Sequence, residues 1–454
     1  MTPLTRSEKG AARRSEFPAD FAFGAATSSY QVEGAAREDG RGPSIWDTFS
    51  HTPGKVRNGD TGDVACDHYH RFAEDLDLLK SLGLTAYRFS VSWPRVLPKG
   101  RGPVNAKGLD FYDRLVDGAL RRGLAPHLTL YHWDLPQALE DKGGWRERDT
   151  AAAFADYASL VAGRLGDRVA TWATHNEPFC SAFLGHLWGK HAPGLADPKA
   201  AFLASHHLLL SHGLGTKALR ASLPGARVGI VNNPAPVHPA TQSPEDRAAA
   251  SRIDAFRNRF FHDPLAGKGY PEEILARALG FLRSVRPDDL ATIAEPIDFL
   301  GVNYYSREVV EDAPGEGLFD ARAVPRGEEH TATSWEVYPD GLREILLRIH
   351  EDYHPKAILV AENGAAYEDV ALPSGRVQDE GRRRYLESHL SACRDALREG
   401  VPLEGYFVWS LIDNFEWAEG FACRFGLARM EVPGGARVVK ASGDWYRAFV
   451  RGEL

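Results

Sequence analysis

Two stretches of the chain each place a glutamate directly after a short apolar run. One is Trp172-Ala-Thr-His-Asn-Glu177-Pro178, and the other is Ala357-Ile-Leu-Val-Ala-Glu362-Asn-Gly364. Polar groups at the tip of a buried strand are costly unless they have a role there. Two carboxyl groups at the ends of separate strands suit the cleavage of a glycosidic bond, which needs one group to protonate the leaving oxygen and one beside the anomeric carbon.

The residues near the ends of other predicted strands favour one division of roles between these two glutamates. We expect Glu177 to be the acid/base and Glu362 the nucleophile, with their carboxyls about 5–5.5 Å apart, the spacing for double displacement with retention. A nucleophile must stay ionised, which the guanidinium of Arg88 and the hydroxyl of Tyr305 would favour. The acid needs less charged surroundings. The sequence leaves the reverse assignment open.

Further side chains have the groups that bind a sugar. Amides, carboxylates and imidazole rings bind hydroxyls, and flat aromatic rings cover the C–H face of the sugar ring. Taken alone, each has an ordinary explanation as a core aromatic, a core histidine or an ion-pair partner. Their joint place at one end of the predicted strands favours a binding site. The candidates for hydroxyls are Gln31, His132, Asn176 and Glu416, and the candidate platforms are Trp409 and Trp417.

Strand-like apolar runs alternate with helical patterns along the chain. Runs that are apolar throughout suit strands buried on both faces of a parallel sheet. Eight such units predict an α/β fold, a single (β/α)8 TIM barrel with its active site at the C-terminal face of the strands. The predicted strands are Phe21–Ala26, Ala86–Trp93, Ala125–Trp133, Val169–Glu177, Arg227–Asn232, Ile297–Tyr305, Ala357–Glu362 and Tyr406–Asp413. The predicted helices are Tyr69–Leu82, Gly108–Arg122, Thr150–Leu165, Pro198–Leu223, Ile253–Phe261, Gly341–Asp352 and Arg382–Glu399.

Two segments do not follow this alternation. Residues 1–16 are polar and are predicted to be a flexible tail, with residues 17–454 forming the single barrel domain. Residues 308–335 are acidic, aperiodic and contain glycine and proline, which predicts a long loop near the mouth of the site.

Charge and cysteine content exclude several classes of function. The net charge of −8 and the isoelectric point of about 6.1 argue against nucleic acid or an acidic membrane as a partner. No run approaches the roughly 18 apolar residues of a membrane span. Four scattered cysteines favour free thiols in a reducing cytoplasm. We expect a small-molecule partner, and the oligomeric state stays open.

Two histidine pairs resemble metal ligands. They are His68-Tyr-His70 and His206-His207. Asp67 and His68 open a helical pattern, however, and are expected to cap it. We therefore predict that the protein has no metal site.

Long ordered motifs make the chain resemble the family 1 glycoside hydrolases, in particular the bacterial β-glucosidases. The resemblance extends from Phe17 to Val450. The Asn176-Glu177-Pro178 and Glu362-Asn363-Gly364 motifs resemble the acid/base and nucleophile elements of that family. The other matching motifs are Phe23-Gly-Ala-Ala-Thr-Ser-Ser-Tyr-Gln-Val-Glu-Gly34, Tyr87-Arg-Phe-Ser-Val-Ser-Trp93, Leu130-Tyr-His-Trp-Asp-Leu-Pro136 and Asn303-Tyr304-Tyr305.

The resemblance implies a retaining, exo-acting β-glucosidase without a metal or organic cofactor. It implies cellobiose and aryl or alkyl β-glucosides as substrates, with β-galactosides, β-fucosides and transglycosylation as side activities. Glu416 implies unphosphorylated glucosides, because a carboxylate repels phosphate, and Glu177 implies O-glycosides. The resemblance also implies site roles: Gln31, His132, Asn176, Glu416 and Trp417 hold the non-reducing sugar, Trp409 is its platform, and Arg88, Asn303 and Tyr305 surround the nucleophile.

Two departures from the family pattern adjoin the catalytic motifs. His175 stands where the family more often has Phe or Leu, and Ala361 stands where it more often has Thr, so the rate or the pH optimum is expected to differ.

Two other functions stay open at this stage. They are net transglycosylation, and a barrel that binds sugar without turning it over, although such a barrel would be expected to lack Glu177 or Glu362.

Overall fold

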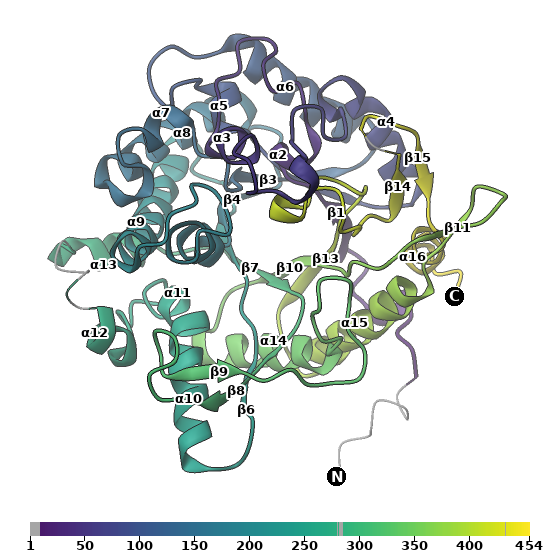
Figure 1. Cartoon of the computed structure of the whole chain (residues 1–454). Helices are drawn as coiled ribbons and strands as arrows, with labels where there is room; N and C mark the ends of the chain where they lie inside the picture. The colour runs from purple at the N-terminus through teal and green to yellow at the C-terminus, as the bar shows by residue number, and fades with distance from the viewer. Residues whose placement is uncertain (1–9, 279, 281–284, 432) are drawn as a thin grey trace.

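Eight parallel strands close into a barrel at the centre of the molecule (Figure 1). The computed structural model describes residues 10–278, 280, 285–431 and 433–454. Neighbouring strands follow the order β1-β13-β10-β7-β5-β4-β3-β2 before the ring closes. All eight predicted strands are confirmed: β1 Ala22–Ala26, β2 Ala86–Ser90, β3 Ala125–Tyr131, β4 Thr171–Asn176, β5 Val228–Asn232, β7 Phe299–Tyr304, β10 Ile358–Asn363 and β13 Leu403–Trp409.

Several strands are shorter than their apolar runs predicted. The run Ala86–Trp93 ends as a strand at Ser90, and Trp93 begins the short helix α5 (Trp93–Val96). The run Tyr406–Asp413 is displaced, because β13 starts at Leu403 and ends at Trp409. Buried apolar residues continue beyond the strand ends because the segments that leave the barrel also fold over the core.

Helices surround the barrel and confirm the predicted alternation. Most begin about two residues before the prediction, because their first turns contain exposed polar residues that carry no apolar period. The predicted helix Ile253–Phe261 is the end of a longer helical stretch that begins at Pro244. The longer helices are α4 His68–Ser81, α6 Ala106–Arg121, α8 Arg148–Leu165, α9 Pro198–Ser222, α10 Pro244–Asp254, α14 Pro339–Tyr353, α15 Glu380–Arg398 and α16 Ala441–Arg451.

The predicted cap of α4 is wrong. Asp67 is at the N-cap position with φ of 55°, but its carboxylate makes no capping bond and instead lies 2.6 Å from His70 Nδ1. His68 Nδ1 lies 2.8 Å from Asp75 Oδ2. His206 likewise contacts Asp289 through Nε2 at 3.0 Å. Within the described residues, no group of three potential ligands is placed to hold a metal ion.

The segment predicted as a long loop over residues 308–335 is partly a sheet. Strand β8 (Glu308–Asp312) pairs with β9 (Ala321–Ala323) and with β6 (Val237–Pro239). These strands are short and partly exposed, so they lack the apolar runs by which the barrel strands were predicted. Two other small sheets pair β11 (Val370–Ala371) with β12 (Val377–Gln378) and β14 (Ala428–Met430) with β15 (Arg437–Val439).

The predicted N-terminal tail, residues 1–16, lies partly outside the described residues. From Gly10 onward the chain contacts α15. The Ala12 N–H donates to Ser391 Oγ at 3.1 Å, Arg394 donates to the Gly10 carbonyl at 3.0 Å, and Arg398 pairs with Glu16 at 2.6 Å. Residues 10–16 are therefore attached to the helical layer.

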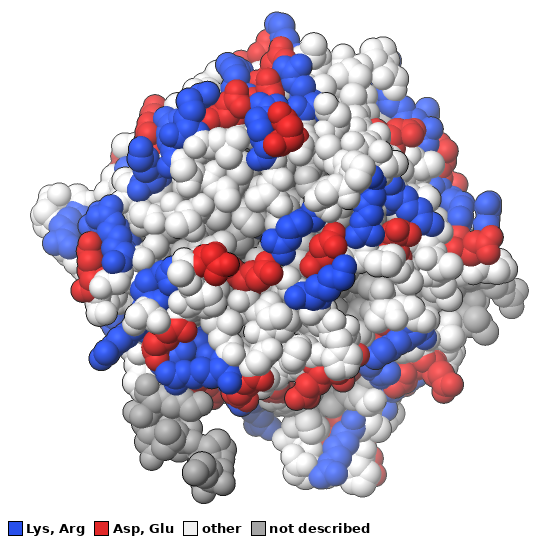
Figure 2. Space-filling view, turned by 180° about the vertical axis from the view of Figure 1, so that it is seen from behind, with Lys and Arg blue, Asp and Glu red and all other residues white. Residues whose placement is uncertain are grey.

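The surface carries charges of both signs. Figure 2 shows Lys and Arg side chains interspersed with Asp and Glu over the side of the molecule opposite to the view of Figure 1. Surface charges are also paired, such as Arg227 with Glu404 at 2.6 Å. In the described part of the chain, no helix is both long and apolar enough to cross a bilayer.

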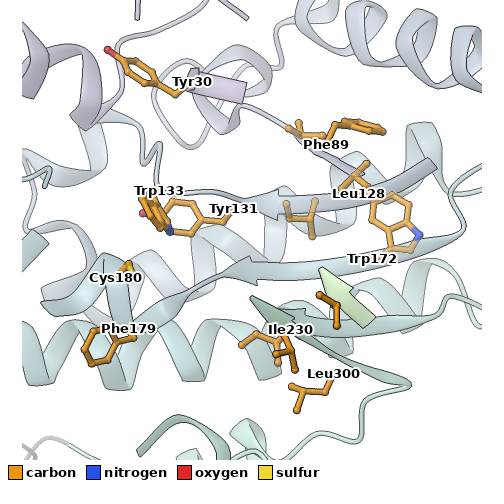
Figure 3. Packing of buried hydrophobic residues seen from close by; sticks show 14 of the residues in the cluster. Tyr30, Phe89, Leu128, Tyr131, Trp133, Trp172, Phe179, Cys180, Ile230 and Leu300 are labelled. Carbon is orange, nitrogen blue, oxygen red and sulfur yellow. The ribbon is translucent and has the colours of Figure 1, made fainter. Parts of the chain in front are cut away.

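Alternate residues of the strands enter two different cores. Outward-pointing Leu128 and Trp172 pair in register and pack against the helices (Figure 3). Each such buried side chain contributes about 1.5–3 kcal/mol. Inward-pointing Ala173 and Leu359 belong to a separate cluster inside the barrel. This inner cluster fills the barrel below the polar side chains at the strand ends.

Candidate active site

A cavity of about 860 Å³ lies at the carboxyl ends of the barrel strands. Glu362 and Asn303 line it from the ends of β10 and β7, and Trp409 lines it from the end of β13. His132 and Glu177 follow β3 and β4 directly and line the same cavity. The structure thus brings both predicted carboxyl groups into one space.

Glu362 has the contacts that were predicted for a nucleophile. Arg88 Nη1 donates to Oε1 at 2.6 Å, and the Tyr305 hydroxyl donates to Oε2 at 2.7 Å. Burial raises the pKa of Glu362 to about 7, the positive charge of Arg88 opposes that rise, and the negative charge of Glu177 adds to it. The charge state of Glu362 therefore depends on whether Glu177 holds a proton.

Glu177 has mostly neutral surroundings. Its Oε1 accepts from Asn303 Nδ2 at 2.6 Å, and its Oε2 accepts from the Cys180 thiol at 3.0 Å. In the described part of the chain, no lysine or arginine forms an ion pair with it. Its φ of 47° is in the left-handed region, which costs about 1–3 kcal/mol and is typical of residues held for function. The strand end turns its carboxyl into the cavity.

A continuous chain of hydrogen bonds joins the two carboxyl groups. The Asn176 side-chain oxygen accepts from Arg88 Nη2 at 2.7 Å and from Asn303 Nδ2 at 3.0 Å. Because Arg88 also binds Glu362 and Asn303 also binds Glu177, the order is Glu177–Asn303–Asn176–Arg88–Glu362. Asn176 Nδ2 donates to His132 Nε2 at 3.0 Å. These side chains fix one another's positions.

The hydrogen-bond donors around the pair are divided unequally between the two carboxyl groups. Of the two carboxyl groups, only Glu362 accepts from Arg88 and Tyr305 among the described contacts, so it is the better place for a negative charge. When Glu177 is protonated, its negative charge no longer raises the pKa of Glu362. The two carboxyl groups therefore have different surroundings, with a guanidinium and a phenol hydroxyl on Glu362 and an amide and a thiol on Glu177.

Glu416 lines one corner of the cavity, and Gln31 lies behind it. Gln31 is on helix α2 (Ser29–Val32) and is fully buried. Its Nε2 donates to Asn414 Oδ1 at 3.0 Å and to Glu416 Oε2 at 3.4 Å. Burial raises the pKa of Glu416 to about 8, and the charge of Glu362 adds to the rise. Glu416 lines the cavity and Gln31 braces it from behind.

Aromatic rings form a wall of the cavity. His132 stacks on Trp409 and on Trp417, with ring centroids 5.8 Å and 6.0 Å apart. Trp133 packs on Trp417 at 4.4 Å. Trp133 and Trp417 have φ of 77° and 50°, so both are held in the left-handed region. Burial lowers the pKa of His132 well below its ordinary value, and Arg88 adds to this, so the ring is neutral.

Sequence reasoning missed several residues of the cavity. Trp133 adjoins a predicted site residue, and Cys180 follows Glu177 by three residues, so their positions could have suggested them. Trp335 comes from the segment predicted as a loop and packs on Tyr305 at 5.1 Å. No sequence pattern indicated that contact. Other cavity residues that were not predicted include Phe179, Trp188, Asn233, Phe256 and Arg257.

His175, the departure beside Asn176, does not face the cavity. It stacks on Phe154 of α8 with ring centroids 4.4 Å apart, and its Nε2 lies 2.7 Å from Ser211 Oγ of α9. It is fully buried in the layer between barrel and helices. An influence of His175 on the site would therefore have to pass through the packing of β4.

Comparison with known proteins is consistent with this geometry. The family model described as Glycosyl hydrolase family 1 matches residues 13–453. Beta-glucosidase A of Thermotoga maritima is 48% identical over 440 residues, which cover 96% of this chain and 98% of that protein. Thermostable beta-glucosidase B of Thermobispora bispora is 51% identical over 440 residues, 96% of this chain and 90% of that protein.

Solved structures show the same fold at similar identity. The family 1 β-glucosidase of Thermotoga maritima superposes with a TM-score of 0.94 at 47% identity, covering 96% of this chain and 98% of that one. The same enzyme in complex with glucoimidazole gives a TM-score of 0.94 with the same identity and coverage. By sequence and by structure, the chain belongs to glycosyl hydrolase family 1.

Proposed function

We propose that this protein is a retaining β-glucosidase that releases terminal non-reducing β-D-glucosyl residues. One observation carries the proposal: two buried carboxyl groups line one cavity with opposite surroundings, Glu362 beside a cation and Glu177 among neutral groups. A hydrolase that proceeds through a covalent glycosyl-enzyme needs this difference between its two carboxyl groups. The two relatives named above are called β-glucosidases, which supports the substrate class.

In the first step, the Glu362 carboxylate attacks the anomeric carbon while Glu177 gives its proton to the glycosidic oxygen. The bond to the aglycone breaks, and a glucosyl ester forms on Glu362. Arg88 and Tyr305 hold the attacking carboxylate in place and ionised. The aglycone leaves as a neutral alcohol, and Glu177 becomes a carboxylate.

In the second step, Glu177 takes a proton from water, and that water attacks the anomeric carbon. The ester bond to Glu362 breaks, so Glu362 is again a carboxylate and Glu177 is again an acid. Each step inverts the anomeric carbon, so the released glucose has the β configuration of the substrate.

The remaining predicted residues are proposed to bind the sugar. Gln31, Asn176, His132 and Glu416 would bind hydroxyls. His132 Nε2 accepts from Asn176, so the neutral ring carries its hydrogen on Nδ1, where it can donate. The rings of Trp409 and Trp417 line the cavity and offer flat faces for the sugar.

The finer substrate range is also a proposal. We infer hydrolysis of cellobiose and of aryl and alkyl β-glucosides, with transglycosylation as a side reaction. A relative from Bifidobacterium breve, 46% identical over 460 residues, is named a bifunctional β-D-glucosidase/β-D-fucosidase, which supports β-fucosides as side substrates. β-Galactosides belong to the same proposal. A carboxylate at Glu416 supports unphosphorylated sugars.

The wider organisation is proposed as well. We infer one catalytic domain over residues 17–454, because the closed barrel uses strands from both ends of the chain, β1 and β13. The steps above need no metal or organic cofactor. Four buried free thiols support a cytoplasmic location.

The decisive experiment is a panel of p-nitrophenyl β-glycosides and cellobiose, with the first anomer released from each followed by NMR. The expected result is turnover that is fastest on glucosides and an initial product of β-glucose. Initial α-glucose would contradict retention. Sugar binding without turnover would instead indicate a barrel that only binds.

A further inference from the structure

The Cys180 thiol is a contact of Glu177 that the steps above do not use. Cys180 begins the π-helical segment η4 (Cys180–Leu187), and its backbone N–H donates to the Glu177 carbonyl at 3.0 Å. This local bond fixes the thiol beside the carboxyl group, where Sγ lies 3.0 Å from Oε2. Cys180 lines the cavity yet is only 7% exposed. Its position is therefore set by the same turn that presents Glu177.

The sulfur keeps its hydrogen at neutral pH. Burial raises the pKa of the Cys180 thiol well above its ordinary value, and the charge of Glu177 raises it further. A thiol has one hydrogen to donate and can also accept weakly at sulfur. Cys180 therefore acts here as a neutral hydrogen-bonding group rather than as a thiolate.

The thiol has a second acceptor on its other side. The end of the Asn233 amide that lies 3.3 Å from the sulfur also lies 3.2 Å from both terminal nitrogens of Arg257, so it is the oxygen, because an amide nitrogen there would face only donors. Arg257 is itself held, with its guanidinium carbon 4.2 Å from the centroid of the Phe179 ring. The single thiol hydrogen can therefore be donated either to Glu177 Oε2 or to the Asn233 side-chain oxygen.

The better acceptor changes when Glu177 changes its charge. An ionised Glu177 is the stronger acceptor, because hydrogen bonds to charged groups are shorter and stronger. Once Oε2 carries a proton, it becomes a donor, and the Asn233 oxygen is the acceptor that remains. We propose that the Cys180 thiol is a positioning residue that turns its hydrogen between Glu177 and Asn233 as Glu177 loses and gains its proton. This inference rests on the proposed acid/base role of Glu177.

A thiol suits this position because its hydrogen bonds are weak. A strong donor would hold Glu177 as a carboxylate and slow its reprotonation, whereas an apolar group would leave the carboxylate without this partner. The other groups that act on Glu177 stay in place when the thiol is removed. They are Asn303 and Tyr305 at and after β7, Glu362 on β10, Glu416 after β13, Arg88 on β2, and Arg257 on η5 (Ala255–Arg259) through Asn233.

The test is the pH profile of kcat/KM on cellobiose for the wild type, Cys180→Ala, Cys180→Ser and Cys393→Ala. Loss of the thiol removes a donor to the carboxylate. The basic limb of kcat/KM in the alanine variant should therefore lie about half a pH unit above that of the wild type. Serine keeps a hydrogen to donate, so its basic limb should return at least half of the way from the alanine position to that of the wild type. Cys393 is buried in α15, away from the cavity, and its alanine variant should match the wild type.

An unchanged basic limb in Cys180→Ala, or a serine variant that behaves like alanine, would overturn the proposal. If Cys180→Ala does not fold, the pH profile of Asn233→Ala tests the same proposal. This substitution removes the acceptor used in the protonated state, so its basic limb should move to lower pH, and no movement would also overturn the proposal. Glu177→Ala separates this from the proposed function: if the basic limb persists without Glu177, the acid/base assignment itself is wrong.

Discussion

Arg88 reaches across the inside of the barrel from β2 to Glu362 on β10, where its Nη1 lies 2.6 Å from Oε1. Its other terminal nitrogen donates to Asn176 at 2.7 Å. A single guanidinium therefore sets both the charge of the proposed nucleophile and the position of the neighbouring amide. A flat two-pronged donor can do this, whereas an ammonium group cannot.

Replacing Arg88 by methionine should raise the pKa of Glu362 further above its ordinary value, because the main effect that opposes burial is lost. The nucleophile must be ionised, so the acidic limb of kcat/KM should move to higher pH, and kcat/KM at pH 6 should fall at least about 100-fold. Arg101→Met is a suitable control, because Arg101 is largely exposed and pairs with Asp149. An acidic limb that stays in place would separate Arg88 from the ionisation of Glu362.

Glu362→Ala should abolish hydrolysis, and added azide should restore turnover of an activated aryl β-glucoside. Azide would attack from the side that Glu362 occupied, so the product should be the α-glucosyl azide. The product is identified by NMR, with the wild type under the same azide concentration as the control. A β-azide from this variant would exchange the roles of Glu362 and Glu177.

Glu177→Ala should affect substrates according to their leaving groups. A dinitrophenolate leaves without a proton, so glucosylation from that substrate should be nearly as fast as in the wild type, whereas cellobiose hydrolysis should fall by at least about 10³-fold. Pre-steady-state release of the phenolate measures the first step alone. Equal losses on both substrates would show that Glu177 supplies no proton.

Glu416→Gln should stabilise the protein at high pH at the expense of activity. Burial raises the pKa of Glu416 to about 8 in the folded state, so the folded protein holds this proton more tightly than the unfolded chain. That stabilising contribution is complete below about pH 4.5 and is lost as the pH rises through about 8. Glutamine cannot ionise, so its advantage in melting temperature should grow from pH 5 to pH 8.5, reaching roughly 2–4 °C.

The control for this prediction is Glu404→Gln, because Glu404 is exposed and pairs with Arg227 at the surface. Its melting temperature should follow that of the wild type across the same pH range. If the difference in melting temperature between Glu416→Gln and the wild type stays constant from pH 5 to pH 8.5, ionisation of Glu416 carries no cost in the folded state.

Lys440→Met should destabilise the fold without touching the cavity. Lys440 is completely buried, and its Nζ lies 2.6 Å from both Asp369 and Asp413. Removing the cation leaves two buried carboxylates with less compensation, which costs about 3–5 kcal/mol. Denaturant unfolding measures the loss. Lys356→Met, at an exposed pair with Asp298, should change the free energy of unfolding by no more than about 0.5 kcal/mol.

The barrel was predictable because its strands lie in runs rich in apolar and β-branched residues that alternate with helical patterns. The site was predictable to the extent that its polar residues follow those runs directly, as Asn176 and Glu362 do. Their contacts followed from topology, since parallel strands of a closed barrel bring their carboxyl ends together. The predicted partners of Glu362, Arg88 and Tyr305, are within hydrogen-bond distance of it.

The features that escaped prediction depend on backbone geometry. Trp133, which was not predicted, has left-handed φ and lines the cavity, and no residue pattern announces such a turn in a tryptophan. Trp335 packs on Tyr305 from the irregular segment between β9 and α14, beside an isolated bridge of His330 with Glu336. The contact of Cys180 with Glu177 arises from the first turn of a π-helical segment, which sequence patterns do not distinguish from an ordinary helix.

The hydrogen-bonded chain from Glu177 to Glu362 has a consequence for heat tolerance. Its five side chains stand on or directly after β2, β4, β7 and β10, and no surface loop takes part. Warming that loosens the rim of the cavity should therefore leave the spacing of the two carboxyl groups unchanged. Turnover should rise with temperature until the barrel itself melts, and the melting curve and the loss of activity should coincide.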